Sequence, residues 1–198
     1  QYWPAKYLID IDGYIVYHHF GEDLYEETET AIQKSLRERA YRLNTVVNMP
    51  SNTTKPTDVV VVNQGGVKSP EVYFGSARNQ LLSNGQNGVS GEQFFLSPTT
   101  VSFNKLYLNG TWNLTPEYAE NKDEGDIIFN YEAKNLYMAA GSDKEIIAEI
   151  YKDDVLIKTI SIKDERLYTL IEGIDYARHT IHIKIPTAGL RVFTFTFG

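Results

Sequence analysis

The feature that most restricts the fold is a long series of short apolar runs, separated by turn signals, from residue 69 to residue 198. Residues 179–185 place His or Ile at every odd position, and residues 191–197 place Arg or Phe there. A period of two is typical of a strand with one buried and one exposed face. Pairs such as Asn109-Gly110 mark tight turns between the runs. This stretch predicts an antiparallel β-sandwich of the jelly-roll type.

The first 43 residues predict a different unit, a β-hairpin followed by one helix. Two apolar runs flank Asp12-Gly13, a pair whose favoured hairpin turn needs positive φ at both residues. Glu22 or Asp23 is expected to cap a helix that runs to about Tyr41, because apolar residues recur at helical spacing and acidic residues precede basic ones. A hairpin and one helix bury too little surface to fold alone. The chain is therefore expected to begin in the middle of a domain.

Between these two units the sequence loses its periodicity. Residues 49–57 are polar and contain two prolines, which is typical of an inter-domain linker. Residues 59–62 are four valines that predict a short strand. The predicted organisation is a unit over residues 1–43, a linker over 44–68 and the sandwich over 69–198. The predicted fold class is mainly β.

Composition excludes several kinds of chemistry. The net charge of −7 argues against a nucleic-acid surface, and the absence of Cys means that this chain has no disulfide or thiol chemistry of its own. No apolar run approaches the roughly 20 residues of a membrane helix. Adjacent His18 and His19 point to opposite faces of a predicted strand, as do His179 and His182, so no metal site is expected. No nucleotide or dinucleotide motif is present, so no cofactor is expected.

Several motifs, spread in order along most of the chain, resemble one known family. The opening motif is Trp3-Pro4-Ala5-x-Tyr7-Leu8-Ile9-Asp10-x-Asp12-Gly13-x-Ile15. Later ones include Ser69-Pro70-Glu71-x-Tyr73-x-Gly75-x-x-Arg78, Leu108-x-Gly110-x-Trp112 and the closing Phe193-x-Phe195-Thr196-Phe197-Gly198. Together they resemble DipZ-type cytochrome c biogenesis and thioredoxin-like proteins. In that family a thioredoxin-like domain precedes a β-sandwich similar to a carbohydrate-binding module.

The resemblance implies that residues 1–43 are the second half of a thioredoxin-like domain, with hairpin and final helix. It implies a cis peptide bond at Pro4, so that Trp3 and Pro4 line the side of a redox site that receives a protein substrate. The family's Cys-x-x-Cys lies upstream of this proline and is absent here, so this chain holds no catalytic residue. The implied parent is an extracytoplasmic thiol-disulfide oxidoreductase, periplasmic or at the cell surface, with protein clients and a membrane attachment.

For the sandwich, the expected activity is binding. The candidate residues for a glycan are Trp112 and Tyr118, with Asn109 and Asn113 beside the tryptophan; Tyr131 and Tyr137 are further candidates. The alternative is that these aromatic residues form the core, and this alternative is favoured for Trp112 because large aromatic side chains are mostly buried. A buried pair of Glu71 and Arg78 is also expected.

Three functions therefore stay open from the sequence. The chain is part of a thiol-disulfide oxidoreductase, or a non-catalytic module that binds carbohydrate or the cell envelope, or a docking and stability domain without a small ligand. The half sheet of the first unit is expected to leave an unpaired strand edge. Such an edge is expected to dock on the sandwich or to pair with another polypeptide, including a second copy in a homodimer.

Overall fold

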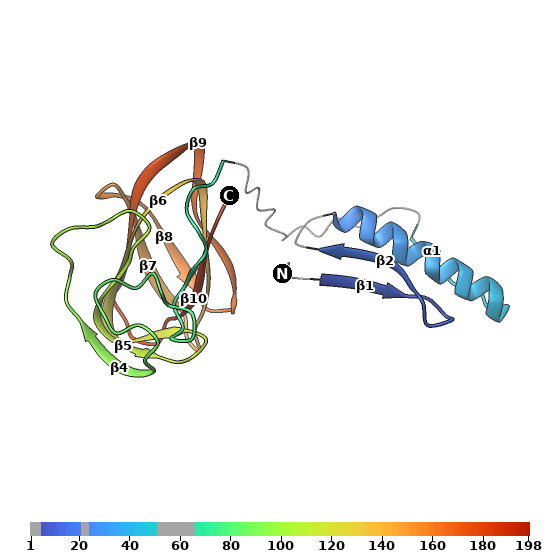
Figure 1. Cartoon of the computed structure of the whole chain (residues 1–198), viewed down its shortest axis with the longest axis horizontal. Coiled ribbons are helices and arrows are strands. Elements are labelled where there is room, and N and C mark those ends of the chain that lie inside the picture. The colour runs from blue at the N-terminus through green and yellow to red at the C-terminus, as the bar shows by residue number, and fades with distance from the viewer. Residues whose placement is uncertain (1–4, 21–23, 51–65) are drawn as a thin grey trace. The chain divides into compact units, whose positions relative to one another are not determined.

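The computed structural model describes residues 5–20, 24–50 and 66–198, and the chain divides into two compact units, Gln1–Val62 and Asn63–Gly198 (Figure 1). The first unit contains β1 (Ala5–Ile9), β2 (Ile15–Phe20) and α1 (Tyr25–Leu43). The strand predicted at residues 59–62 and most of the predicted linker lie outside the described residues. The strands of the second unit are β3 (Val72–Tyr73), β4 (Gly91–Phe95), β5 (Leu106–Leu114), β6 (Ala119–Gly141), β7 (Ile146–Lys152), β8 (Val155–Ile162), β9 (Arg166–Ile185) and β10 (Arg191–Phe197).

The turn between β1 and β2 is longer than the predicted two-residue turn. Only Gly13 has a positive φ, 88°, whereas Asp12 does not. The Gly13 N–H donates to the carbonyl oxygen of Asp10 at 3.2 Å. The Asp10 carboxylate accepts the backbone N–H of Asp12 at 2.9 Å and of Tyr14 at 2.8 Å. The expectation of positive φ at both central residues was wrong, because the Asp10 side chain organises a wider loop.

Helix α1 begins after Leu24, which has a left-handed backbone (φ 46°) and makes no side-chain capping bond. Glu22 and Asp23, the predicted cap residues, lie outside the described residues. The helix contacts the hairpin through the hydroxyls of Tyr17 and Thr28, 3.0 Å apart, and through an ion pair that links Arg42 to the hairpin turn. These contacts are mostly polar, so the first unit has little core of its own.

The second unit is a sandwich of two layers that share its longest strands. One layer has the order β4-β5-β6-β9-β7-β8, formed by the first part of β6 and the last part of β9. The other has the order β3-β10-β6-β9, formed by the last part of β6 and the first part of β9. All these pairings are antiparallel except the one between β10 and β6. With the hairpin and helix, this architecture confirms the predicted mainly β fold class.

The strands β6 and β9 change layers at one bend, where their register shifts between Ala133 and Asn135. At this bend the backbone N–H groups of Lys134 and Asn135 donate to the Gly198 carbonyl at 3.1 Å and 2.7 Å. The Asn135 side chain accepts the Gly173 N–H at 3.2 Å. The polar groups released by the break in the ladder are thus satisfied locally.

The strand β10 contains a bulge that reverses its predicted alternation. Its register shifts between Val192 and Thr194, so Val192 is buried and Phe193 is only half-buried. Phe195 and Phe197 are buried as expected. The prediction that Phe193 shares their face was wrong, because one extra residue shifts the phase of the side chains.

The core fills the space between the layers. Its largest fully buried side chains are Trp112, Tyr131, Phe74, Phe95, Phe129 and Phe195. Phe74 and Phe129 both pack on the ring of Phe195, with ring centroids 5.0 Å and 6.1 Å away. Edge-to-face packing of this kind adds to the free energy gained from burying apolar surface.

The predicted buried pair at the entry to the sandwich does not form. Glu71 and Arg78 are both exposed. Tyr73 lies between them: its hydroxyl donates to the Glu71 carboxylate, and the Arg78 guanidinium lies 3.5 Å from the centre of its ring. The aromatic ring replaces the expected direct contact with a cation–π contact.

Candidate functional site

The residues predicted to line a redox site, Trp3 and Pro4, lie outside the described residues. The described chain starts with Ala5, which begins β1 and pairs with Phe20 of β2. The strands β1 and β2 form an antiparallel ladder whose register shifts between Leu8 and Ile9.

Trp112 is a core residue and offers no platform for a sugar. Its side chain is fully buried, and its indole N–H donates to the carbonyl oxygen of Asn109 at 2.8 Å. Tyr131 and Tyr137 are buried as well. A pyranose stacks on a ring with one open face, and none of these three rings has one.

Asn109 belongs to a polar row across β5, β6 and β9. It lies opposite Asp126, which lies opposite Lys184. The Asn109 amide donates to the Asp126 carboxylate at 2.8 Å, and Nε2 of His182 lies 3.4 Å from the other carboxylate oxygen. Partial burial acts to raise the pKa of Asp126, but the contacts with His182 and Asn109 and the charge of Lys184 outweigh it, so this pKa lies below its ordinary value.

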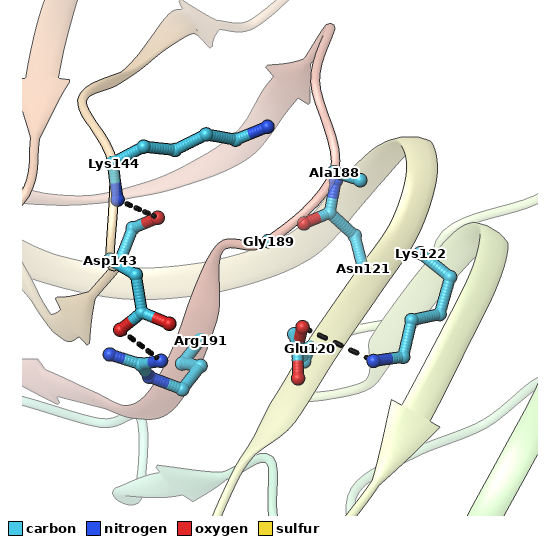
Figure 2. Close-up of a pocket in the computed structure, with 9 residues that line it drawn as sticks. Glu120, Asn121, Lys122, Asp143, Lys144, Ala188, Gly189 and Arg191 are labelled. Atoms are coloured by element: carbon cyan, nitrogen blue, oxygen red, sulfur yellow. Dashed lines mark hydrogen bonds and ion pairs between the residues drawn. The ribbon is translucent and has the colours of Figure 1, made fainter.

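A polar pocket of about 350 Å³ lies where β6 and β10 begin (Figure 2). Three segments that are far apart in sequence line it: Glu120, Asn121 and Lys122; Ser142, Asp143 and Lys144; Ala188, Gly189 and Arg191.

Two of the predicted glycan residues lie near Glu120 in the strands, but neither of them lines the pocket. Asn113 of β5 lies directly opposite Glu120, and residues in opposed positions present their side chains on the same face. Tyr118 precedes Glu120 by two residues and packs edge-on against Phe193 with ring centroids 5.5 Å apart. Asn109, by contrast, lies in the separate polar row.

Two ion pairs set the charge of the pocket (Figure 2). Arg191 contacts Asp143 at 2.9 Å, and Lys122 contacts Glu120 at 3.2 Å. The hydrogen bond and charge of Asp143 raise the pKa of Arg191 above its ordinary value. With three cationic and two anionic side chains in the lining, the pocket keeps one positive charge in a chain whose net charge is −7.

Asn121 holds the floor of the pocket in place. Its side chain is fully buried, its amide donates to the carbonyls of Asp123 at 2.6 Å and Thr187 at 2.9 Å, and its oxygen accepts the Leu190 N–H at 2.8 Å. Its backbone carbonyl also accepts the Gly189 N–H at 2.9 Å. One side chain thus fixes the segment 187–190 against the start of β6.

In the part of the chain that the structure describes, no group of three or more His, Cys, Asp or Glu side chains is arranged to hold a metal ion. His179 and His182 lie on opposite faces and contact different carboxylates, Asp153 at 2.6 Å and Asp126 at 3.4 Å. These pairs join strands and turns of the sandwich.

Sequence reasoning missed Lys122, Lys144 and Arg191. Each lies in a different segment, and only the pairing of β6 with β10 and the return of the chain after β6 bring them together. The one local signal was Gly189 between two predicted strands, since a glycine there marks a special turn. Its φ is +102°.

Residues 69–198 match the family described as thioredoxin like C-terminal domain. The chain belongs to this family. Protein DipZ from Mycobacterium bovis and Protein DipZ from Mycobacterium tuberculosis are each 28% identical to it over 199 residues, covering 100% of this chain and 27% of each relative. The predicted DipZ-type resemblance is confirmed, and this member of the thioredoxin like C-terminal domain family spans about a quarter of the length of these relatives.

Among solved structures, a family 6 carbohydrate-binding module is similar to this family member, with a TM-score of 0.36, 12% identity, and coverage of 66% of this chain and 93% of that chain. A similarity at this level says nothing of what the chain binds. Across the described ranges, no helix combines the length and the apolar character that crossing a membrane requires.

Proposed function

We propose that this chain is the C-terminal region of an extracytoplasmic, thioredoxin-like thiol-disulfide oxidoreductase. Its hairpin and helix are part of the thioredoxin-like domain, and its sandwich is an appended binding or docking domain. The observation that carries this proposal is the identity with the DipZ relatives, which extends over the whole chain and so includes the hairpin and helix.

The exposed apolar surface of the first unit supports this assignment. The exposed fractions are 60% for Ile9, 71% for Tyr14 and 60% for Ile15. Large apolar side chains that cluster on one small unit mark a surface that another part of a protein covers. Other elements of a thioredoxin-like domain that pack on this face would cover them in the parent protein; the alternative occupant is a second copy of this chain.

The chemistry would come from two cysteines elsewhere in the parent, since this chain contains none. In a dithiol enzyme, one thiolate attacks the client disulfide to form a mixed disulfide, and the second thiolate then releases the reduced client. Trp3 and Pro4 would present backbone groups to the client beside these cysteines. The clients would be proteins outside the cytoplasm, and the parent would be attached to the membrane.

Reduction of insulin by the parent protein in the presence of dithiothreitol tests this proposal. We expect Pro4→Ala to lower the rate severalfold, whereas Pro186→Ala, in an exposed loop of the sandwich, leaves it unchanged. A parent gene without Cys-x-x-Cys upstream of this region would contradict the proposal. Light scattering of the chain alone shows whether a second copy covers the hairpin.

The sandwich has a second candidate function, binding of a saccharide in the pocket of Figure 2. The supporting observation is the mixed lining of cationic donors and carboxylate acceptors. Sugar hydroxyls both donate and accept, so they suit a lining of both kinds. Titration of the chain with neutral and acidic monosaccharides, followed by NMR, tests this function; no shift at any pocket residue would exclude it.

A further inference from the structure

We propose that the pocket binds a saccharide unit that carries one carboxylate, and that Lys144 pairs with this carboxylate. The proposal rests on the saccharide function proposed above and names the class of sugar.

Two of the three cationic side chains of the pocket are held in ion pairs. Arg191 is held by Asp143 at 2.9 Å, and Lys122 by Glu120 at 3.2 Å. Among the described residues that line the pocket, no carboxylate forms an ion pair with the Lys144 ammonium. The positive charge that remains in the pocket is therefore located on Lys144.

The position of Lys144 is defined by its surroundings. Its backbone N–H donates to the Ser142 hydroxyl at 3.4 Å. A Cβ added to Gly189 would lie 3.8 Å from Cε of Lys144, so the aliphatic stem passes over this glycine. Figure 2 shows the side chain extended across the pocket toward the segment of Ala188 and Gly189. The ammonium thus stands at the pocket while the stem packs on a loop that Asn121 fixes.

The two carboxylates of the lining, Glu120 and Asp143, favour an anion with one negative charge over an anion with two. A phosphate group, with close to two negative charges, would meet repulsion from Glu120 and Asp143, and like charges at such an interface cost binding free energy. A sugar carboxylate brings one negative charge, which matches the one unpaired cation. The hydroxyls of the same sugar can donate to Glu120 and Asp143, which a simple carboxylate such as acetate cannot do.

The size of the pocket limits the ligand further. A volume of about 350 Å³ lies at the lower end of the range of small-molecule sites, about 300–1,000 Å³. The pocket therefore takes one monosaccharide unit, free or at the end of a chain.

The experiment is an NMR titration of the full, ¹⁵N-labelled chain with four probes: sodium glucuronate, methyl glucuronate ester, glucose and sodium acetate. We expect glucuronate to shift the amide signals of Asn121, Ser142 and Gly189, and to bind about tenfold more tightly than the neutral ester, since a charge-assisted contact is lost in the ester. Lys144→Gln is expected to remove this difference. Lys105→Gln, an exposed lysine before β5, is the matched control and should leave it intact.

Each other outcome has a defined meaning. Equal binding of glucuronate, ester and glucose overturns the acidic-sugar inference and leaves the saccharide function standing. Binding of acetate as tight as that of glucuronate overturns both, because the pocket then takes any small carboxylate. Absence of binding by all four probes also overturns both. Tight glucuronate binding that survives Lys144→Gln overturns the role of Lys144, provided that the variant keeps the native spectrum.

Discussion

At the scale of single residues, Asn121 shows how one buried polar side chain can build a site. It makes three side-chain hydrogen bonds with backbone groups of two segments, and it has no exposed surface. Buried polar groups stabilise a fold when their hydrogen-bonding capacity is met, and they destabilise it when one partner is lost. The pocket therefore depends on a residue that a ligand would hardly touch.

We predict that Asn121→Ala lowers the free energy of unfolding by about 2–3 kcal/mol, because it leaves the Leu190 N–H and two carbonyls without their partner. Urea unfolding followed by circular dichroism measures the change. The control is Asn113→Ala, a half-buried residue on the neighbouring strand. A loss below about 0.5 kcal/mol, the size typical of surface substitutions, would contradict the role given to Asn121.

Asp126 makes stability depend on pH. Burial acts against its ionised form, but His182 and Asn109 favour that form more strongly, so its pKa in the folded chain is below the ordinary value. A depressed carboxylate pKa contributes stability above the pKa of the unfolded chain, about 4, and this contribution is lost as the pH falls through the folded pKa.

We therefore predict that Asp126→Asn lowers stability at pH 7 and flattens its decrease below about pH 4. Urea midpoints measured between pH 7 and pH 3 test this, with the exposed Asp123→Asn as control. If both variants followed the pH profile of the unmodified chain, the contacts of Asp126 would have no influence on stability.

At the scale of elements, the turn between β7 and β8 shows how sequence and backbone conformation agree. Asp153 and Asp154 have φ values of 51° and 66°, as a two-residue turn with both central residues left-handed requires. Asp153 also accepts the Thr180 N–H at 2.8 Å and contacts His179. Asp154 has no such anchoring contact among the described interactions.

We predict that Asp154→Gly raises the free energy of unfolding by up to about 1 kcal/mol, because glycine adopts positive φ without steric cost. Asp164→Gly is the control, since its φ is not in the left-handed region, and it is expected to give no gain. The two variants are compared by thermal unfolding. Equal effects of both substitutions would show that the turn geometry has no part in the change.

The sequence predicted most strands but not their continuity. The sequence predicted a series of short strands, whereas β6 and β9 are each one long strand; the run at residues 179–185, for example, is the end of β9. Local alternation breaks at Lys134 and at Gly173 because the strands bend there and change layers. The bulge that leaves Phe193 only half-buried escaped prediction for the same reason: a pattern of period two does not show where one residue is inserted.

The site was less accessible to sequence reasoning than the fold. Trp112 suggested a ligand platform by its residue type, yet its burial could be judged only from the arrangement of both layers. Lys144 carries no motif, and its importance comes from the pairing of its charged neighbours. Tyr118 and Asn113, two of the residues predicted for a glycan, lie near Glu120 in the strands. The charged residues that line the pocket were not predicted.

At the scale of the whole molecule, the two units differ in how much core each contains. The second unit has a continuous apolar core, whereas Gln33 and Ala40 are the buried residues of α1 in the first. We predict that residues 66–198 alone unfold in one cooperative transition.

We expect residues 1–50 alone to lack dispersed amide signals in NMR spectra. A cooperative transition of residues 1–50 by themselves would contradict the view that this unit needs a further partner.

The place of β10 in the sandwich also has a consequence for synthesis in the cell. It lies between β3 and β6, so one layer pairs a segment near residue 72 with a segment near residue 195. Contacts of such long sequence separation form late and slowly. On the ribosome, the layer lacks an inner strand until residue 197 has left the exit tunnel. Until then the strand edges of β3 and β6 that pair with β10 stay open to chaperones and to other nascent chains.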